Sequence, residues 1–198
     1  MKHLHWMGFT AAAFVAIAAQ ASPIVTVGNY TLAPGATLTI PLNVSDTAAA
    51  AAEDIEGMSF TVQLNNGIGS TPMILNVDLL SGTVWVGHSA IVTTPSGGNL
   101  LQFQSRSVMT GSAGDFISAN GLLGSITFDA TSAATGSYTI LLVGTLSPAN
   151  DSQFQDGLGE PVSATFGQGT LTVAVPEPAC LSLLGLGGMM LWRRSRKS

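Results

Sequence analysis

The sequence predicts an all-β fold, an antiparallel β-sandwich of about nine strands that lies between two removable ends. Three observations lead to it. Apolar and polar residues alternate with a period of two along several segments, as expected when one face of each strand is buried. Turn-forming Gly, Pro, Asn and Ser separate these segments. Helices long enough to connect parallel strands are not indicated between them, so neighbouring strands are expected to pair antiparallel.

The alternation is clearest in residues 38–44 and 58–64. Pro41 falls on the outward side of its segment, which predicts an edge strand, because proline lacks the N–H that a central strand donates. Residues 47–54, with their run of alanines, have the composition of a short helix. The remaining strand candidates are 24–27, 74–80, 83–86, 100–107, 122–128, 137–146 and 169–175.

Charge excludes several classes of partner. All 11 acidic residues fall between Asp46 and Glu177, whereas Arg106 is the one basic residue outside the two ends. The formal charge of −5 therefore becomes −10 (1 basic against 11 acidic residues) for residues 22–178, which include Glu177. Such a surface repels nucleic acid, because phosphates need Lys or Arg to neutralise them. The body, residues 22–175, contains no cysteine, so disulfides contribute nothing to its stability.

The N-terminus has the pattern of a signal peptide over residues 1–21. Lys2 precedes an apolar run, residues 7–19, and Ala19-Gln20-Ala21 has the small-x-small form of a signal-peptidase site. Cleavage is expected after Ala21, and the body is therefore expected to be exported.

The C-terminal tail, residues 176–198, has three parts in a fixed order. Pro176-Glu177-Pro178 comes first, an apolar run of residues 179–192 follows, and the basic residues Arg193, Arg194, Arg196 and Lys197 close the chain. Fourteen helical residues rise about 21 Å, against about 30 Å of hydrocarbon, so this run is a poor permanent anchor. The basic residues favour the cytoplasmic side, which leaves the body outside.

This three-part tail resembles the PEP-CTERM tail of exported bacterial proteins. The resemblance implies that an exosortase, a membrane-embedded cysteine protease or transpeptidase, recognises Pro176, Glu177 and Pro178 and removes the apolar segment. It also links such proteins to exopolysaccharide and biofilm. An ordinary single-span anchor that follows Pro-Glu-Pro is the alternative.

The order of the body's segments is similar to that of a second family, the cohesin-like β-sandwich with its jelly-roll arrangement. The segments that carry this likeness are 36–44, 55–62, 75–82, 121–128 and 169–173. The resemblance implies a module that binds another protein through a sheet face. Residues 63–67 depart from the family, since cohesins usually have Tyr-Asp-Pro at this place, so dockerin binding is not carried over.

Catalytic and metal sites are not indicated. Residues 83–91 resemble the Gly-His-Ser turn of α/β-hydrolases, but Ile91 replaces the second glycine and no histidine follows His88. Asp151, Asp156 and Glu160 are weak calcium candidates in one loop, without the spacing of an EF-hand. We therefore expect no enzyme activity and no cofactor.

Trp85 is the body's one tryptophan, and it has two interpretations. If Val84 and Val86 point inward, the indole points outward and can stack on a sugar ring. Alternatively, the indole packs at the edge of the sandwich.

The sequence thus favours a non-enzymatic protein of the cell surface or extracellular matrix. It would be held briefly at the inner membrane by its tail and then released by an exosortase to the surface or the medium. A carbohydrate-binding module that uses Trp85 is the first alternative, and a cohesin-like protein-binding module is the second.

Overall fold

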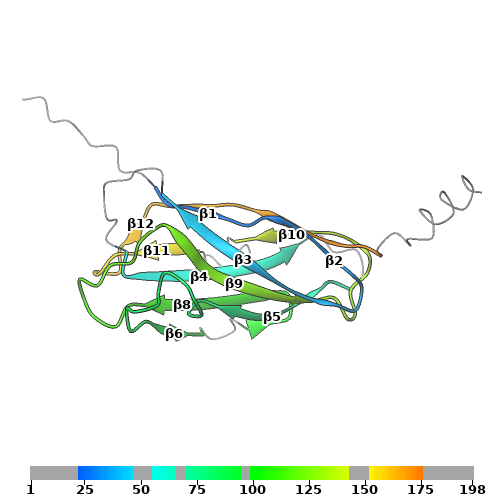
Figure 1. Ribbon diagram of the computed structural model, residues 1–198, viewed down its shortest axis with the longest axis horizontal. Helices are drawn as coiled ribbons and strands as arrows, with labels where there is room; N and C mark the ends of the chain where they lie inside the picture. The colour runs from blue at the N-terminus through cyan, green and yellow to red at the C-terminus, as the bar shows by residue number, and fades with distance from the viewer. Residues whose placement is uncertain (1–21, 47–54, 66–69, 95–98, 143–151, 176–198) are drawn as a thin grey trace, which may run out of the picture.

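The computed structural model describes residues 22–46, 55–65, 70–94, 99–142 and 152–175, which form two β-sheets packed face to face (Figure 1). Helices are absent from these segments, and the predicted all-β sandwich is confirmed. The strands are β1 (Ile24–Thr26), β2 (Asn29–Leu32), β3 (Thr37–Ser45), β4 (Gly57–Asn65), β5 (Met73–Asp78), β6 (Ile91–Thr93), β7 (Asn99–Leu100), β8 (Phe103–Met109), β9 (Gly121–Asp129), β10 (Gly136–Leu141), β11 (Gln153–Gln155), β12 (Pro161–Val162), β13 (Thr165–Phe166) and β14 (Gly169–Val173).

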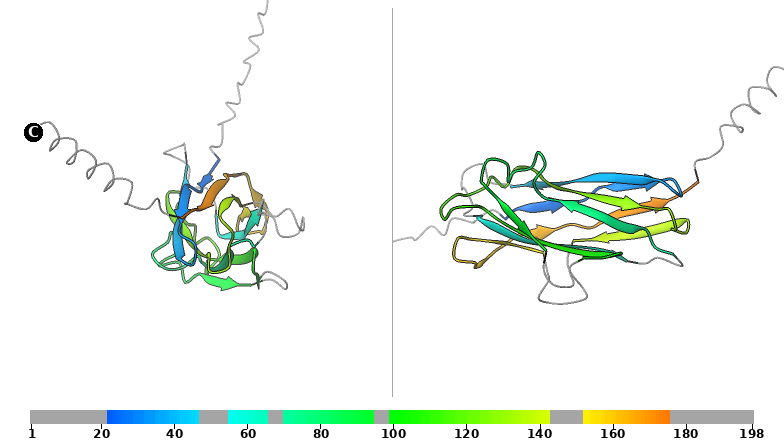
Figure 2. Two further views of the ribbon diagram at one scale, coloured as in Figure 1. Left: turned by 90° about the vertical axis from the view of Figure 1, so that its right-hand side faces the viewer. Right: turned by 90° about the horizontal axis from the view of Figure 1, so that it is seen from below.

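The five-stranded sheet, here called sheet A, has the order β13-β1-β3-β9-β5. The nine-stranded sheet B contains the path β12-β11-β4-β10-β14-β2, with β8 beside β4 and with β6 and β7 beside β8. The views in Figure 2 show the two sheets as separate layers with their strands along the long axis.

The prediction that all strands pair antiparallel is wrong for two pairs. β1 runs parallel to β13, and β2 runs parallel to β14. β1 belongs to sheet A and β2 belongs to sheet B. The beginning of the described chain therefore lies beside its end in both sheets, as β1 beside β13 and as β2 beside β14. The strands of each pair come from opposite ends of the body, so the whole domain provides the connection that a parallel pair needs.

The core lies between the sheets and is built from the alternating positions that the sequence indicates. In β4, Met58, Phe60 and Val62 are fully buried, and in β3 the side chains of Ile40 and Leu42 face them. The largest side chains without exposure include Phe128, Phe154 and Ile126. Burial of such a set is the main favourable contribution to the stability of a domain that has no disulfide.

Residues 83–86, predicted as a strand, form turns instead. The Thr83 hydroxyl donates to the carbonyl oxygen of Leu79 at 2.8 Å, and Val86 N–H donates to the carbonyl oxygen of Thr83 at 3.1 Å. These local bonds close turns where the alternation alone indicates an extended chain. β2, β6, β11, β12 and β13 were not predicted, because two to four residues are too short to show a period of two.

Pro41 does not lie in an edge strand as predicted, since β3 sits between β1 and β9. However, β1 pairs with β3 only from Asn43 to Ser45 and then leaves for sheet B. Pro41 therefore has a paired strand on one side only, where it lies opposite Ser125 of β9. This local edge accommodates a residue without an N–H.

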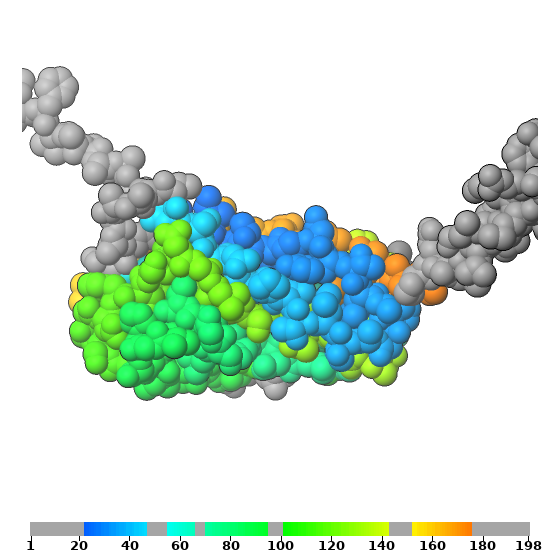
Figure 3. Space-filling view, viewed as in Figure 1, coloured from blue at the N-terminus to red at the C-terminus, as the bar shows by residue number. Residues whose placement is uncertain are grey.

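The two ends of the sandwich differ in charge. The first described residue, Ser22, lies at one end and the last, Val175, at the opposite end (Figures 1 and 3). We call the end near Ser22 the acidic end, because it contains the loops 79–90 and 110–120 and the hairpin 156–160. Five of the seven described carboxylates lie in or beside it: Asp46, Glu56, Asp115, Asp156 and Glu160. Asp78 lies at mid-length, opposite Ser125 in the middle of β9. The opposite, neutral end consists of the turns 33–36, 70–72 and 130–136, and Asp129 is its one described carboxylate.

Candidate functional site

The side of sheet B turned away from the core is here called its outer face, and the register of the strands gives its composition. The centre of this face is buried, since Thr61, Ser105 and Phe103 are 0%, 2% and 4% exposed, whereas the positions around it are half-buried or exposed. Residues that pair across neighbouring strands point to the same side of a sheet. Opposite the buried positions of β4, the outward row reads Gly57, Ser59, Thr61, Gln63 and Asn65. The partners of this row on adjacent strands are Met109, Ser107, Ser105 and Phe103 on β8, Gln155 and Gln153 on β11, and Leu141 and Thr139 on β10.

Charged side chains are absent from this face among the residues that the structure describes. The row at the neutral end continues from Asn65 through Thr139 and Thr170 to Asn29, all of them hydroxyl or amide side chains. The body's single cation, Arg106, pairs with Phe60 on the core side of β8 and so does not face outward. Its guanidinium donates to Gln104 Oε1 at 2.8 Å, and burial lowers its pKa from the ordinary value.

One row of this face is apolar. Ile91 of β6 lies directly opposite Met109 of β8, and they are 63% and 46% exposed. The row continues from Met109 to Gly57, and the methionine side chain lies over this glycine: a Cβ added to Gly57 would be 3.2 Å from the methionine Cγ. On the far side of Gly57 the row ends with Gln155 and Pro161. The result is a partly apolar strip across five adjacent strands, β6, β8, β4, β11 and β12.

The centre of the face is tied together by hydroxyl groups. β10 pairs with β4 near Asn65 and β11 pairs with it near Gly57, so the middle of β4 lacks a continuous neighbour on that side. There the Ser152 hydroxyl donates to the carbonyl oxygen of Thr61 at 2.9 Å and accepts from Thr61 N–H at 2.9 Å. Thr61 Oγ1 also donates to Ser105 Oγ at 3.2 Å. A side chain thus takes the place of one backbone pair beside β4.

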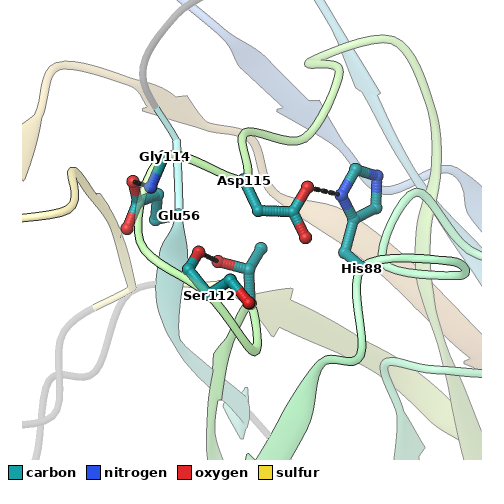
Figure 4. A network of polar contacts seen from close by, with 6 residues as sticks. Glu56, His88, Ser112, Gly114 and Asp115 are labelled. Atoms are coloured by element: carbon teal, nitrogen blue, oxygen red, sulfur yellow. Dashed lines mark hydrogen bonds and ion pairs between the residues drawn. The ribbon is translucent and has the colours of Figure 1, made fainter.

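A polar network supports the acidic end of the face (Figure 4). His88 Nδ1 and Asp115 Oδ1 lie 2.7 Å apart and join the loops 79–90 and 110–120. Gly111 N–H donates to the carbonyl oxygen of His88 at 2.9 Å. In the same loop, Gly114 N–H donates to Oε1 of Glu56, a side chain only 6% exposed. These contacts fix two loops to each other and to the start of β4.

Trp85 is 1% exposed, so its indole offers no face to a sugar in this structure. It belongs to the hydrophobic core cluster, beneath the turns of the loop 79–90. The outward alternation expected for Trp85 fails because residues 83–86 are not a strand. Its Nε1–H is buried without a hydrogen-bond partner.

The calcium candidates that the structure describes serve a different role. Asp156 Oδ1 accepts from Leu158 N–H at 2.9 Å and from Glu160 N–H at 2.8 Å, which closes the turn between β11 and β12. Glu160 is exposed at the end of this turn, and Asp151 lies outside the described residues. Groups of three or more His, Cys, Asp or Glu placed to hold a metal ion do not occur in the described segments.

The predicted signal-peptide and sorting residues lie outside the described residues. They are Ala19, Ala21, Pro176, Glu177, Pro178, Arg193, Arg194, Arg196 and Lys197. The alanine-rich segment 47–54 is outside them as well. Within the described part of the chain, there is no helix of the length and apolarity that a membrane span requires.

Sequence reasoning did not find the outer face of sheet B as a site. Its hydroxyl and amide side chains occupy the polar positions of the alternation, which in sequence look like any solvated strand face. One signal was available: the segments 57–65, 103–109 and 136–141 contain no acidic residue, although the body is strongly acidic.

Known protein families and curated proteins give no match to this chain. Solved structures that are similar to this chain include cohesin domains. CaCohA2 from Clostridium acetobutylicum has a TM-score of 0.57 at 16% identity, over 77% of this chain and 91% of that one. A non-cellulosomal cohesin from Archaeoglobus fulgidus has 0.52 at 19% identity, over 83% and 98%. The sixth cohesin of scaffoldin B from Acetivibrio cellulolyticus, solved with a Cel5 dockerin, has 0.52 at 16% identity, over 78% and 99%. At these identities the likeness concerns the fold, and the body of this chain has the cohesin-like β-sandwich fold.

Proposed function

We propose that this chain is a non-enzymatic interaction module of an exported protein and that it binds another exported protein through the outer face of sheet B. The observation that carries the proposal is the absence of charge from the described residues of that face in an acidic body, together with the exposed Ile91–Met109 pair. The centres of protein interfaces are poor in charged residues and rich in methionine. Burying hydroxyls and amides against a partner requires hydrogen bonds but no removal of a charge from water.

The fold supports a protein partner. Cohesins with this fold have been solved in complex with dockerins, which are themselves proteins. The likeness does not identify the partner here, because the identity is low and residues 63–67 depart from the family. A partner that forms hydrogen bonds to the half-buried and exposed Ser, Thr, Gln and Asn side chains around the buried centre fits this face.

A neutral polysaccharide is the second candidate, because hydroxyls and amides also hydrogen-bond to sugars. However, the described part of the face exposes no aromatic ring for stacking: Phe103 is 4% exposed and Trp85 is in the core. A protein partner is therefore favoured over a sugar.

The test uses residues 22–175 as bait against proteins exported by the producing cell. The face variant Ile91→Glu/Met109→Glu places two charges on the apolar strip, and the matched control Leu75→Glu/Thr39→Glu places two charges on sheet A. The face variant should lose a specifically retained protein that the wild type and the control both retain, with equal melting temperatures for all three. Equal retention by both variants would contradict the proposal, and retention of the cell's polysaccharide in place of a protein would select the second candidate.

We further propose that the tail, residues 176–198, routes the protein to the cell surface through an exosortase. The three-part pattern of the tail supports this role, and the described chain leads into the tail from an exposed end, since Val175 is 67% exposed. Mass spectrometry of the mature protein tests the role. Peptides from residues 181–197 should be missing from surface material, and their recovery there would count against processing.

A further inference from the structure

The sandwich is electrically polar along its long axis, and this polarity has a consequence at a membrane. Five of the seven described carboxylates lie at the acidic end, and Asp78 lies at mid-length opposite Ser125. At the neutral end, the Asp129 carboxylate accepts from Thr131 N–H at 2.8 Å and from its hydroxyl at 2.6 Å, so even this charge is engaged in a turn. The polypeptide leaves the body from the neutral end, at Val175.

We infer that, while its tail holds it, the body stands end-on at an anionic lipid surface, with the neutral end toward the lipid and the acidic end outward. The inference rests on the proposed role of the tail as a membrane hold. It adds which surface of the body faces the lipid, namely the turns 33–36, 70–72 and 130–136. Of these turns, Pro34, Ser132 and Thr135 are exposed and uncharged.

The dimensions make the two orientations distinct. A strand of nine residues, such as β3 or β9, is about 30 Å long. The Debye length at physiological salt is about 8 Å, so in the upright pose the acidic end lies beyond more than three screening lengths. In a flat pose the acidic end is no farther from the lipid than the neutral end, so its carboxylates lose this separation. At a surface potential of about −30 mV, each elementary negative charge brought to the surface is disfavoured roughly threefold.

The upright pose also serves the proposed interaction face. Both sheet faces run along the long axis, so an upright body presents the outer face of sheet B sideways to the medium along its whole length (Figure 2). The flat pose would cover one sheet face or one open side of the sandwich with lipid. Acidic repulsion therefore keeps the face available before the tail is removed.

The test uses residues 22–198 with Cys180→Ser, a change that leaves the protein free of cysteine. Single cysteines then report on the two ends: Ser132→Cys at the neutral end, and Leu158→Cys at the acidic end, where the leucine is 88% exposed. Each protein is labelled with a fluorophore and mixed with vesicles that carry a quencher on their head groups. Matched vesicles of anionic and of zwitterionic lipid are compared, with and without about 0.5 M salt.

We expect strong quenching at position 132 on both vesicles and several-fold weaker quenching at 158 on anionic vesicles. Raising the salt, or adding Asp46→Asn/Glu160→Gln, should increase quenching at 158 on anionic vesicles toward its value on zwitterionic ones. Equal quenching at 132 and 158 on anionic vesicles, by a protein that floats with them, would overturn the orientation alone. A protein that does not float with vesicles would instead overturn the role of the tail, and the orientation with it.

Discussion

At the scale of single residues, the hydroxyl of Ser152 pairs with the backbone of β4 in the way that a neighbouring strand normally does. It lies at the gap between β10 and β11 and forms two hydrogen bonds to the backbone of Thr61, which is fully buried. Ser152 itself is 8% exposed. A serine is suited to this position because one hydroxyl both donates and accepts.

Ser152→Ala should lower the free energy of unfolding by about 1–3 kcal/mol, because it removes two hydrogen bonds from buried backbone groups. Urea unfolding followed by intrinsic fluorescence measures this change. Ser107→Ala is the matched control, since Ser107 is half-buried on the same face without such a role, and its effect should stay below about 0.5 kcal/mol. Similar losses in both variants would mean that Ser152 does not bridge the gap.

Asp78 makes a pH-dependent contribution at the end of β5. Hydrogen bonds from Ser81, and then from the backbone of Leu80, hold the pKa of the Asp78 carboxyl below its ordinary value of 3.8. A carboxyl with a lowered pKa in the folded state stabilises the fold above its unfolded pKa, and this stability is lost as the pH falls through the folded pKa.

Asp78→Asn should therefore be slightly less stable than the wild type at pH 7, and the difference should shrink as the pH falls below about 3.8. Melting temperatures of the two proteins between pH 2 and pH 7 measure it. A difference that stays constant over this range would show that the charge of Asp78 does not matter.

Trp85 follows the second of its two interpretations, a packed indole, and not the first. The alternation around Trp85 favours an outward indole, but the hydroxyl of Thr83 closes turns with the carbonyl oxygens of Leu79 and Leu80. Competition between a side-chain hydrogen bond and an extended backbone is decided by the surrounding structure, which the local sequence does not contain.

At the scale of elements, long strands were predictable and short ones were not. β3, β4 and β9 have nine residues each, and their apolar positions appear in the sequence with a clear period. β12 and β13 have two residues each, and their pairing depends on the positions of β11 and β1. The outer face of sheet B depends on register between strands distant in sequence, which alternation within each strand does not reveal.

The loop 79–90 packs closely on β9, and a glycine allows it. At Gly124 an added Cβ would lie 2.7 Å from Leu79 Cδ2 and 2.9 Å from the carbonyl oxygen of Asp78. Val84 N–H donates to the carbonyl oxygen of Leu122 at 2.8 Å, so the loop lies along the start of this strand. The sequence gives this glycine no distinguishing feature.

Gly124→Ala should destabilise the protein by about 1–3 kcal/mol, because the methyl group overlaps a buried side chain and a carbonyl. Thermal unfolding measures it, with Ser125→Ala on the same strand as the control. A neutral effect of Gly124→Ala would mean that the loop does not pack on β9 as described.

At the scale of the whole molecule, the body is almost free of cleavage sites for proteases of the trypsin class. Arg106 is its one Lys or Arg, in a strand that pairs with β4 on one side and with β6 and β7 on the other. Its guanidinium donates to Gln104, whose amide in turn donates to the carbonyl oxygen of Ile74 at 2.7 Å. Cleavage there requires that the sandwich open.

Trypsin should therefore cut the native body after Arg106 only at the rate at which the domain unfolds. Increasing urea should raise the rate of cleavage. Gel electrophoresis over time gives the rate, with the urea-unfolded protein as the control for rapid cleavage. Prompt cleavage at Arg106 in native buffer would contradict the pairing of β8.

The central claim is that the body works outside the cell by binding a protein through the outer face of sheet B. Site-specific photo-crosslinking in the producing cells tests it most directly, with the photoreactive side chain at Ser107 on that face or at Thr39 on the outer face of sheet A. A discrete crosslinked protein is predicted from position 107 and none from position 39. A product from position 39 alone, or none from either position, would contradict the account.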